Sequence, residues 1–101
     1  MDDIQIVKEL KENIRAIYPD AEIFFYGSRV AGTHQDDSDY DVLVLLKEVN
    51  PNARDTVYDI AWETGFKYDA FISPVLAQKD EFIGLSGSPF FNNVKNYGIA
   101  V

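Results

Sequence analysis

Five consecutive apolar residues, Val42 to Leu46, follow directly on a pair of aspartates, Asp39 and Asp41. A run that is apolar on both faces predicts a strand in the centre of a sheet, because a strand with one face in water alternates apolar and polar residues. Aspartate is depleted in strands, so its presence at the start of a buried strand indicates more than packing. The chain must fold so that a central strand begins beside two acidic side chains.

The segment before these aspartates predicts a second strand, which ends at a turn suited to anions. Residues 21–26 are rich in aromatic and branched side chains and lead into Gly27-Ser28, separated from Asp39 by ten residues. A connection this short makes the two strands antiparallel, so the turn and the aspartates lie at one end of the sheet. Gly27 lets backbone approach a phosphate closely, and a helical turn from Ser28 offers N–H groups to an anion. Arg29 is a further candidate for phosphate contact.

The remaining pattern completes a single domain over residues 1–101, of the α/β (α+β) class, with a small mixed β-sheet flanked by helices. A full helix between the second and third strands predicts that they are parallel, because parallel neighbours need a long connection. The other expected elements are a helix through Ile6–Ile17 closed by Pro19, a helix from Pro51 capped by Gly65, a strand Phe66–Ser73 stopped by Pro74, a short helix Leu76–Ile83, a loop Gly84–Gly87, a helix Pro89–Tyr97 after Ser88, and an apolar tail Ile99–Val101.

This strand order brings a third carboxylate, Asp69, to the edge of the sheet that carries Asp39 and Asp41. Asp39 and Asp41 point the same way along a strand, with Cα atoms about 7 Å apart. Two carboxylates about 6 Å apart repel by about 3 kcal/mol at an effective dielectric of 20. A divalent cation removes that penalty, and an all-oxygen ligand set favours Mg²⁺ or Mn²⁺. We therefore expect the three aspartates to hold metal for an in-line phosphoryl transfer.

Other notable residues near this pattern have plainer expected roles. Asp36 and Asp37 are expected to cap a polar loop rather than to bind metal. His34, in the same loop, is expected to be exposed. Trp62 is expected to lie in the core or on a surface that meets a partner, rather than against a cofactor.

Composition excludes several classes of partner. The net charge of −8 and the isoelectric point near 4.4 argue against nucleic acid, because binding phosphates requires a basic face. The chain has no cysteine, which removes both disulfides and thiolate zinc sites. Its first residues show no signal pattern, and its longest apolar run is too short to span a bilayer. We expect a cytoplasmic, soluble protein without a membrane or nucleic-acid partner.

The segment GSRVAGTHQDDSDYDVLVLL, with Asp69 in the place of a later strand aspartate, resembles the minimal nucleotidyltransferases of the DNA polymerase β-like superfamily. The resemblance implies a metal-dependent transfer of a nucleoside monophosphate, AMP from ATP, with release of pyrophosphate. It implies that Asp39 and Asp41 hold the metals and that Gly27 and Ser28 hold the triphosphate. It further implies that Asp69 shares a metal and helps to activate the acceptor hydroxyl.

Stand-alone members of this size resemble antitoxins paired with a small helical HEPN-domain protein, and some place AMP on a tyrosine of that partner. Larger relatives add a second domain that grips the acceptor, which this chain lacks. The resemblance therefore implies that the acceptor is bound by a partner protein or by a homo-oligomer of this chain.

Two other classes of function stay open at this point. The chain can be a catalytically inert binding module that neutralises a basic partner by direct contact, which its net charge of −8 favours. It can also transfer a nucleotide to a small molecule such as an aminoglycoside, although so short a chain has little material for a second pocket. Loss of function on replacing Asp39 and Asp41 would separate the enzyme from the binding module.

Overall fold

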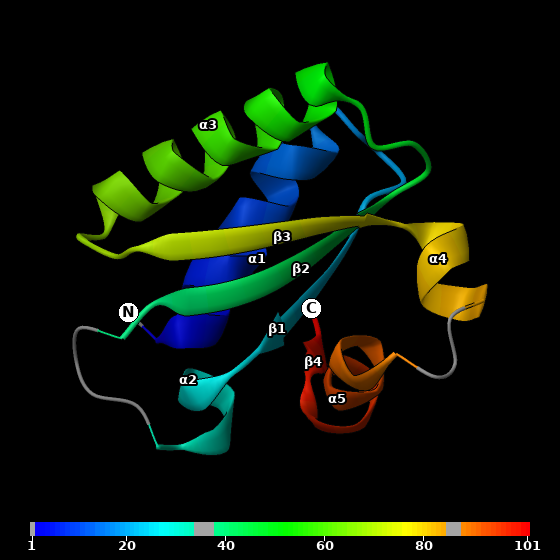
Figure 1. Ribbon diagram of the computed structural model, residues 1–101. Coiled ribbons are helices and arrows are strands. Elements are labelled where there is room, and N and C mark those ends of the chain that lie inside the picture. The colour runs from blue at the N-terminus through cyan, green and yellow to red at the C-terminus, as the bar shows by residue number, and fades with distance from the viewer. Residues whose placement is uncertain (1, 34–37, 85–87) are drawn as a thin grey trace.

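A four-stranded mixed sheet organises the computed structural model, which describes residues 2–33, 38–84 and 88–101 (Figure 1). The strands lie in the order β3 (Ile72–Gln78), β2 (Tyr40–Leu46), β1 (Glu22–Tyr26) and β4 (Ile99–Ala100). β1 runs antiparallel to β2 and β4, and β2 runs parallel to β3. The predicted fold class and both strand pairings that involve β2 are confirmed.

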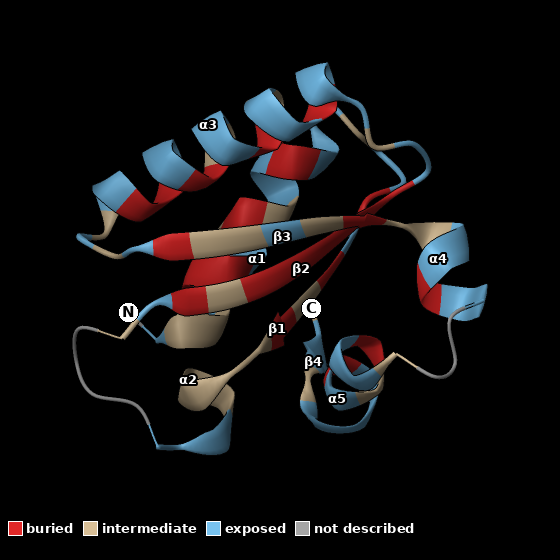
Figure 2. Cartoon of the chain, viewed as in Figure 1, coloured by how far each residue is buried: buried red, intermediate tan, exposed pale blue. Residues whose placement is uncertain are grey.

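Helices cover both faces of this sheet. α1 (Asp3–Arg15) and α3 (Pro51–Lys67) pack on one face, while α4 (Lys79–Gly84) and α5 (Pro89–Tyr97) pack on the other (Figure 1). The short helix α2 (Ser28–Ala31) follows β1 at the end of the sheet. Figure 2 shows that burial is concentrated on β2, of which residues 42–46 are almost completely buried. β2 is therefore a central strand, as its unbroken apolar run predicts.

The three long helices each begin directly after a residue whose side chain caps them. The side chains of Asp2, Asn50 and Ser88 accept hydrogen bonds from backbone N–H groups three residues later, at 2.9, 2.8 and 3.3 Å. Pro51 and Pro89 lie in the first turns of α3 and α5, where a backbone N–H would have no acceptor within the helix.

The expected strand Phe66–Ser73 is wrong, because α3 continues to Lys67 and β3 begins only at Ile72. Gly65 does not cap the helix. A Cβ on Gly65 would lie 2.5 Å from the carbonyl oxygen of Ala70. The glycine therefore allows the backbone at Ala70 to pack directly against the helix. Pro74 lies inside β3, which is an edge strand and so tolerates a residue without an N–H.

The last residues of the chain add a short strand to the sheet. The expected apolar tail forms β4, which pairs with Phe24 and Phe25 of β1. His34, Asp36 and Asp37 lie outside the described residues, as do residues 85–87 of the expected loop. Within the described residues no helix has the length and apolar surface that crossing a membrane requires.

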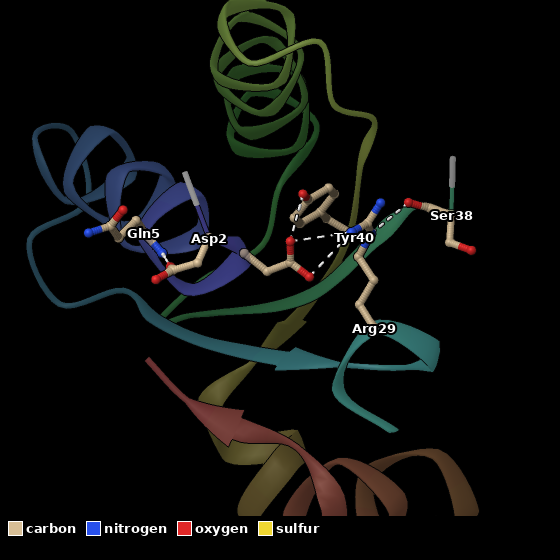
Figure 3. A network of polar contacts seen from close by, with 6 residues as sticks. Asp2, Gln5, Arg29, Ser38 and Tyr40 are labelled. Atoms are coloured by element: carbon tan, nitrogen blue, oxygen red, sulfur yellow. Dashed lines mark hydrogen bonds and ion pairs between the residues drawn. The ribbon is translucent and has the colours of Figure 1, made fainter. Parts of the chain in front are cut away.

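A buried ion pair ties α2 to α1 and to the start of β2 (Figure 3). The Arg29 guanidinium lies 3.2 Å from the Asp3 carboxylate, and its Nε donates to the Ser38 carbonyl at 2.8 Å. The Tyr40 hydroxyl donates to the same carboxylate at 2.9 Å, and the guanidinium carbon lies 4.0 Å from the centre of the Tyr40 ring. Only 8% of the Arg29 side chain is exposed. These contacts fix the two chain segments that flank residues 34–37.

Replacing Arg29→Gln is expected to lower the free energy of unfolding by about 2–3 kcal/mol, because a half-buried carboxylate loses its charged donor. The urea midpoint at unchanged denaturant slope measures this loss. Lys67→Gln is the matched control, because it removes the ion pair between Lys67 and Glu9. The Lys67 side chain is 62% exposed, so this pair contributes little to stability. A midpoint shift in Lys67→Gln as large as in Arg29→Gln would contradict the structural role of the buried pair.

Candidate active site

Gly27 joins β1 to α2 in a conformation that only glycine adopts easily. Its φ of 90° and ψ of −160° lie in a region that side chains disfavour. A Cβ on Gly27 would lie 2.3 Å from Oδ2 of Asp41. The glycine thus allows the Asp41 carboxylate to lie directly against the turn. Ser28 is the first residue of α2 and is half-buried beside this contact.

Asp41 occupies the second position of β2, between Tyr26 of β1 and Ser73 of β3. Asp39 lies just before the strand and is exposed. Burial, and then the negative charge of Asp39, raise the pKa of Asp41 above its usual value. The ionised form of Asp41 is therefore less favourable than that of a free aspartate, and a nearby positive charge would stabilise it.

Tyr26 forms the wall beside the two carboxylates. Its ring meets the ring of Phe90 edge-on, with centroids 5.4 Å apart. Burial, followed by the charge of Asp41, raises the pKa of the Tyr26 hydroxyl. The hydroxyl therefore stays protonated at neutral pH and is available as a hydrogen-bond donor.

Asp69 does not join this pair, contrary to the sequence-based expectation. It lies in the turn between α3 and β3, with a φ of 52°, and borders a cavity with Tyr40 and Ile72 on the side of α3. Asp41 belongs to the opposite face, because it alternates in phase with Leu43, which packs against α4 and α5. Among the described residues no three acidic or histidine side chains come close enough to hold one ion.

The error about Asp69 has a physical cause. The third strand begins at Ile72 instead of Phe66, six residues later than the sequence pattern indicates, so Ser73 instead of Asp69 lies beside Asp41. No local signal marks Ser73, since its importance comes only from the register of β3 against β2. Arg29 also differs from expectation, because its guanidinium contacts Asp3, Ser38 and Tyr40, which makes it part of the frame.

The chemistry of the carboxylate pair fits a hard divalent cation. Asp39 and Asp41 supply only oxygen donors, and the pKa of Asp41 is raised by burial and then by the charge of Asp39. Mg²⁺ is commonly bound through one or two carboxylates, with water and substrate phosphates completing its shell. Two aspartates beside a glycine turn can therefore hold such an ion against a phosphorylated substrate.

Comparison with known proteins agrees with this arrangement. A family model described as a nucleotidyltransferase domain matches residues 7–88, which include the turn and the carboxylate pair. A Methanocaldococcus jannaschii protein, provisionally named a protein adenylyltransferase, is 34% identical over 104 residues, covering 100% of both chains.

Solved structures show the same fold. A toxin–antitoxin structure determined with AMP-PNP has a TM-score of 0.64 at 24% identity, over 99% of this chain and 72% of that chain. A tri-AMPylated Shewanella oneidensis HEPN toxin in complex with an MNT antitoxin has a TM-score of 0.54 at 22% identity, over 96% of this chain and 66% of that chain. With the family model spanning most of the sequence, the chain belongs to the nucleotidyltransferase domain family.

Proposed function

We propose that this nucleotidyltransferase moves AMP from ATP to a hydroxyl group of a partner protein. The observation that carries the proposal is the Asp41 carboxylate held against the Gly27 turn, with its pKa raised by burial and then by the charge of Asp39. The family and the name of the relative from Methanocaldococcus jannaschii support transfer of a nucleotide to protein.

In this proposal Asp39 and Asp41 hold a divalent ion, Mg²⁺ or Mn²⁺, whose charge would offset that of the triphosphate. Gly27 and Ser28 would bind the triphosphate at the start of α2, and Tyr26 would close one side of the site. The acceptor oxygen bonds to the α-phosphorus as the bond to the bridging oxygen breaks. Pyrophosphate leaves with that electron pair, and the hydroxyl proton passes to solvent. Asp69 has no role here, because it lies toward α3.

The proposed partner is a HEPN-domain protein, and the chain would act as its antitoxin. Support comes from the shared fold with an MNT antitoxin that was solved in complex with a HEPN toxin. The proposed transfer needs a hydroxyl group on a second molecule as its acceptor. A partner that carries the acceptor hydroxyl meets that requirement.

The direct test incubates the protein with α-labelled ATP, Mg²⁺ and a HEPN-domain protein encoded next to it. We expect label on the partner with the wild type, and only background label with Asp39→Asn or Asp41→Asn. Removing Mg²⁺ with a chelator is expected to abolish labelling as well. An unlabelled partner, under conditions where the wild type binds ATP, would refute transfer to protein. Neutralisation of the partner by a folded double variant would instead favour the inert binding module.

Gly27→Ala is expected to reduce the rate of transfer by about a hundredfold, because the new methyl group displaces the Asp41 carboxylate. Gly32→Ala is the matched control, since Gly32 also has a positive φ, 78°, but nothing lies within 4 Å of its added Cβ. Each variant is expected to lose about 1–2 kcal/mol of stability from backbone strain. Equal losses of rate in the two variants would show that strain alone, and not the position of Asp41, limits transfer.

Asp41→Asn is expected to unfold at higher urea than the wild type at neutral pH without divalent cation. The folded pKa of Asp41 is raised, so its ionised form weakens the fold above that pKa. The difference in urea midpoint between the two proteins should disappear as the pH falls through that pKa, because the Asp41 carboxylate of the wild type becomes protonated. Adding Mg²⁺ should stabilise the wild type and leave Asp41→Asn unchanged. A difference that does not vary with pH would contradict this origin.

A further inference from the structure

α3 buries small side chains and exposes large aromatic ones, the reverse of the usual arrangement. Its buried positions include Ala53, Val57 and Ala61. Tyr58, Trp62 and Phe66, spaced four residues apart on one face, are 41%, 63% and 74% exposed. The rings of Trp62 and Phe66 stack, with centroids 5.2 Å apart and planes at 13°. Exposed apolar patches of this kind mark interaction sites in soluble proteins.

This aromatic row forms one wall of a cavity of about 790 Å³ between α3 and the start of β3. Tyr40, Asp69 and Phe71 contribute to the other walls, and Phe71 is 70% exposed. The volume lies within the range of sites that bind ligands or inserted side chains. The aromatic face is therefore hollow, and a protruding group of a partner can enter it.

Negative charge accompanies the aromatic row. Asp55, Asp59 and Glu63 are exposed, and each lies three residues before one of the three aromatic residues. Residues at this spacing are neighbours on a helix surface. Every aromatic side chain in the row thus has a carboxylate beside it, which favours a partner that combines apolar and basic groups.

The carboxylate of Asp69 adds to this charge inside the cavity. Within the described ranges it has no side-chain hydrogen bond or ion pair, whereas the cations of α3 lie near its two ends. Arg54 is in the first turn, and Lys67, in the last, is already paired with Glu9. Arg29 also lines the cavity, but its guanidinium is paired with Asp3. The centre of the aromatic row thus combines rings with carboxylates, which favours organic cations.

We propose that this face docks the acceptor protein through a basic side chain, Arg or Lys, that enters the cavity over Trp62 and Phe66 toward Asp69. Aromatic side chains at the centre of an interface supply most of its binding energy, and a neighbouring carboxylate selects a cation. A second copy of this chain is disfavoured, because each copy carries a net charge of −8. The inference rests on the proposed function, which requires an acceptor held by another molecule.

The position of the cavity suits that role. Ser38 and Tyr40 line it, and Asp39 lies between them in the chain. A protein seated on the aromatic face would lie at the end of the sheet that carries the carboxylate pair.

Trp62 is the only tryptophan of the chain, so its fluorescence reports directly on this face. The probe is a helical peptide with one stripe of leucine and arginine, compared with the same peptide carrying glutamine for arginine. We expect a saturable shift of Trp62 emission with the arginine peptide, and binding about fivefold weaker or more with the glutamine peptide. Phe66→Ala and Asp69→Asn should weaken arginine-peptide binding by about fivefold or more.

Tyr97→Ala is the matched control, because Tyr97 is also an aromatic residue on a helix and is 72% exposed, but lies on α5. It should bind the peptide as the wild type does. Equal binding by Phe66→Ala and the wild type, or of the two peptides, would overturn the proposal. Concentration-dependent dimerisation of the wild type that Trp62→Ala abolishes would also overturn it, in favour of a second copy.

The transfer assay separates this inference from the proposed function. With the acceptor protein, Phe66→Ala should raise KM for the acceptor by about fivefold or more and leave ATP binding unchanged. If the wild type binds the arginine peptide but labels no protein, the proposed function fails and the docking face remains. If it labels the acceptor with equal KM in the wild type and Phe66→Ala, the docking face fails alone.

Discussion

β2 is buried on both faces, and the geometry of the candidate active site depends on that burial. Val42 and Val44 pack toward α1 and α3, whereas Leu43 and Leu45 pack toward α4 and α5. A slip of one residue in strand register would exchange the two faces and carry Asp41 into an apolar core. Each such side chain contributes about 1.5–3 kcal/mol when buried, so packing holds the carboxylate beside the glycine turn.

The fold treats two of its carboxylates in opposite ways. Asp3 is neutralised within the protein by Arg29 and accepts a hydrogen bond from Tyr40. Asp41 has Asp39 as its charged neighbour, and its pKa is raised. The first arrangement stabilises the frame around the site. The second places two carboxylates together, and a bound cation would reduce their repulsion. The electrostatic repulsion in the fold therefore lies where binding can offset it.

α3 connects the stability of this domain with its interactions. Its small inward residues let the helix lie close to the sheet, and its large outward residues contribute little to the isolated fold. A chain of 101 residues has limited apolar surface to spare, so a row of exposed rings is costly to solubility unless a partner covers it. Asp41 and the aromatic row lie toward opposite faces of the sheet, but both lie near the start of β2, so the proposed partner would be close to the carboxylate pair.

The sequence by itself determined the central strand, its antiparallel partner, the starts of the helices at Pro51 and Pro89, and the glycine turn before two aspartates. These features follow from short-range patterns: apolar runs, capping side chains and a ten-residue connection. The helix expected from Leu76 begins instead at Lys79, because β3 continues to Gln78. Only the tertiary structure decided that Asp69 borders the cavity beside α3 instead of joining the aspartate pair, that Ser73 lies beside Asp41, and that Arg29 is paired with Asp3. The reason is physical, because the register of β3 depends on how far α3 extends before the chain returns over Gly65, and no local pattern encodes that contact.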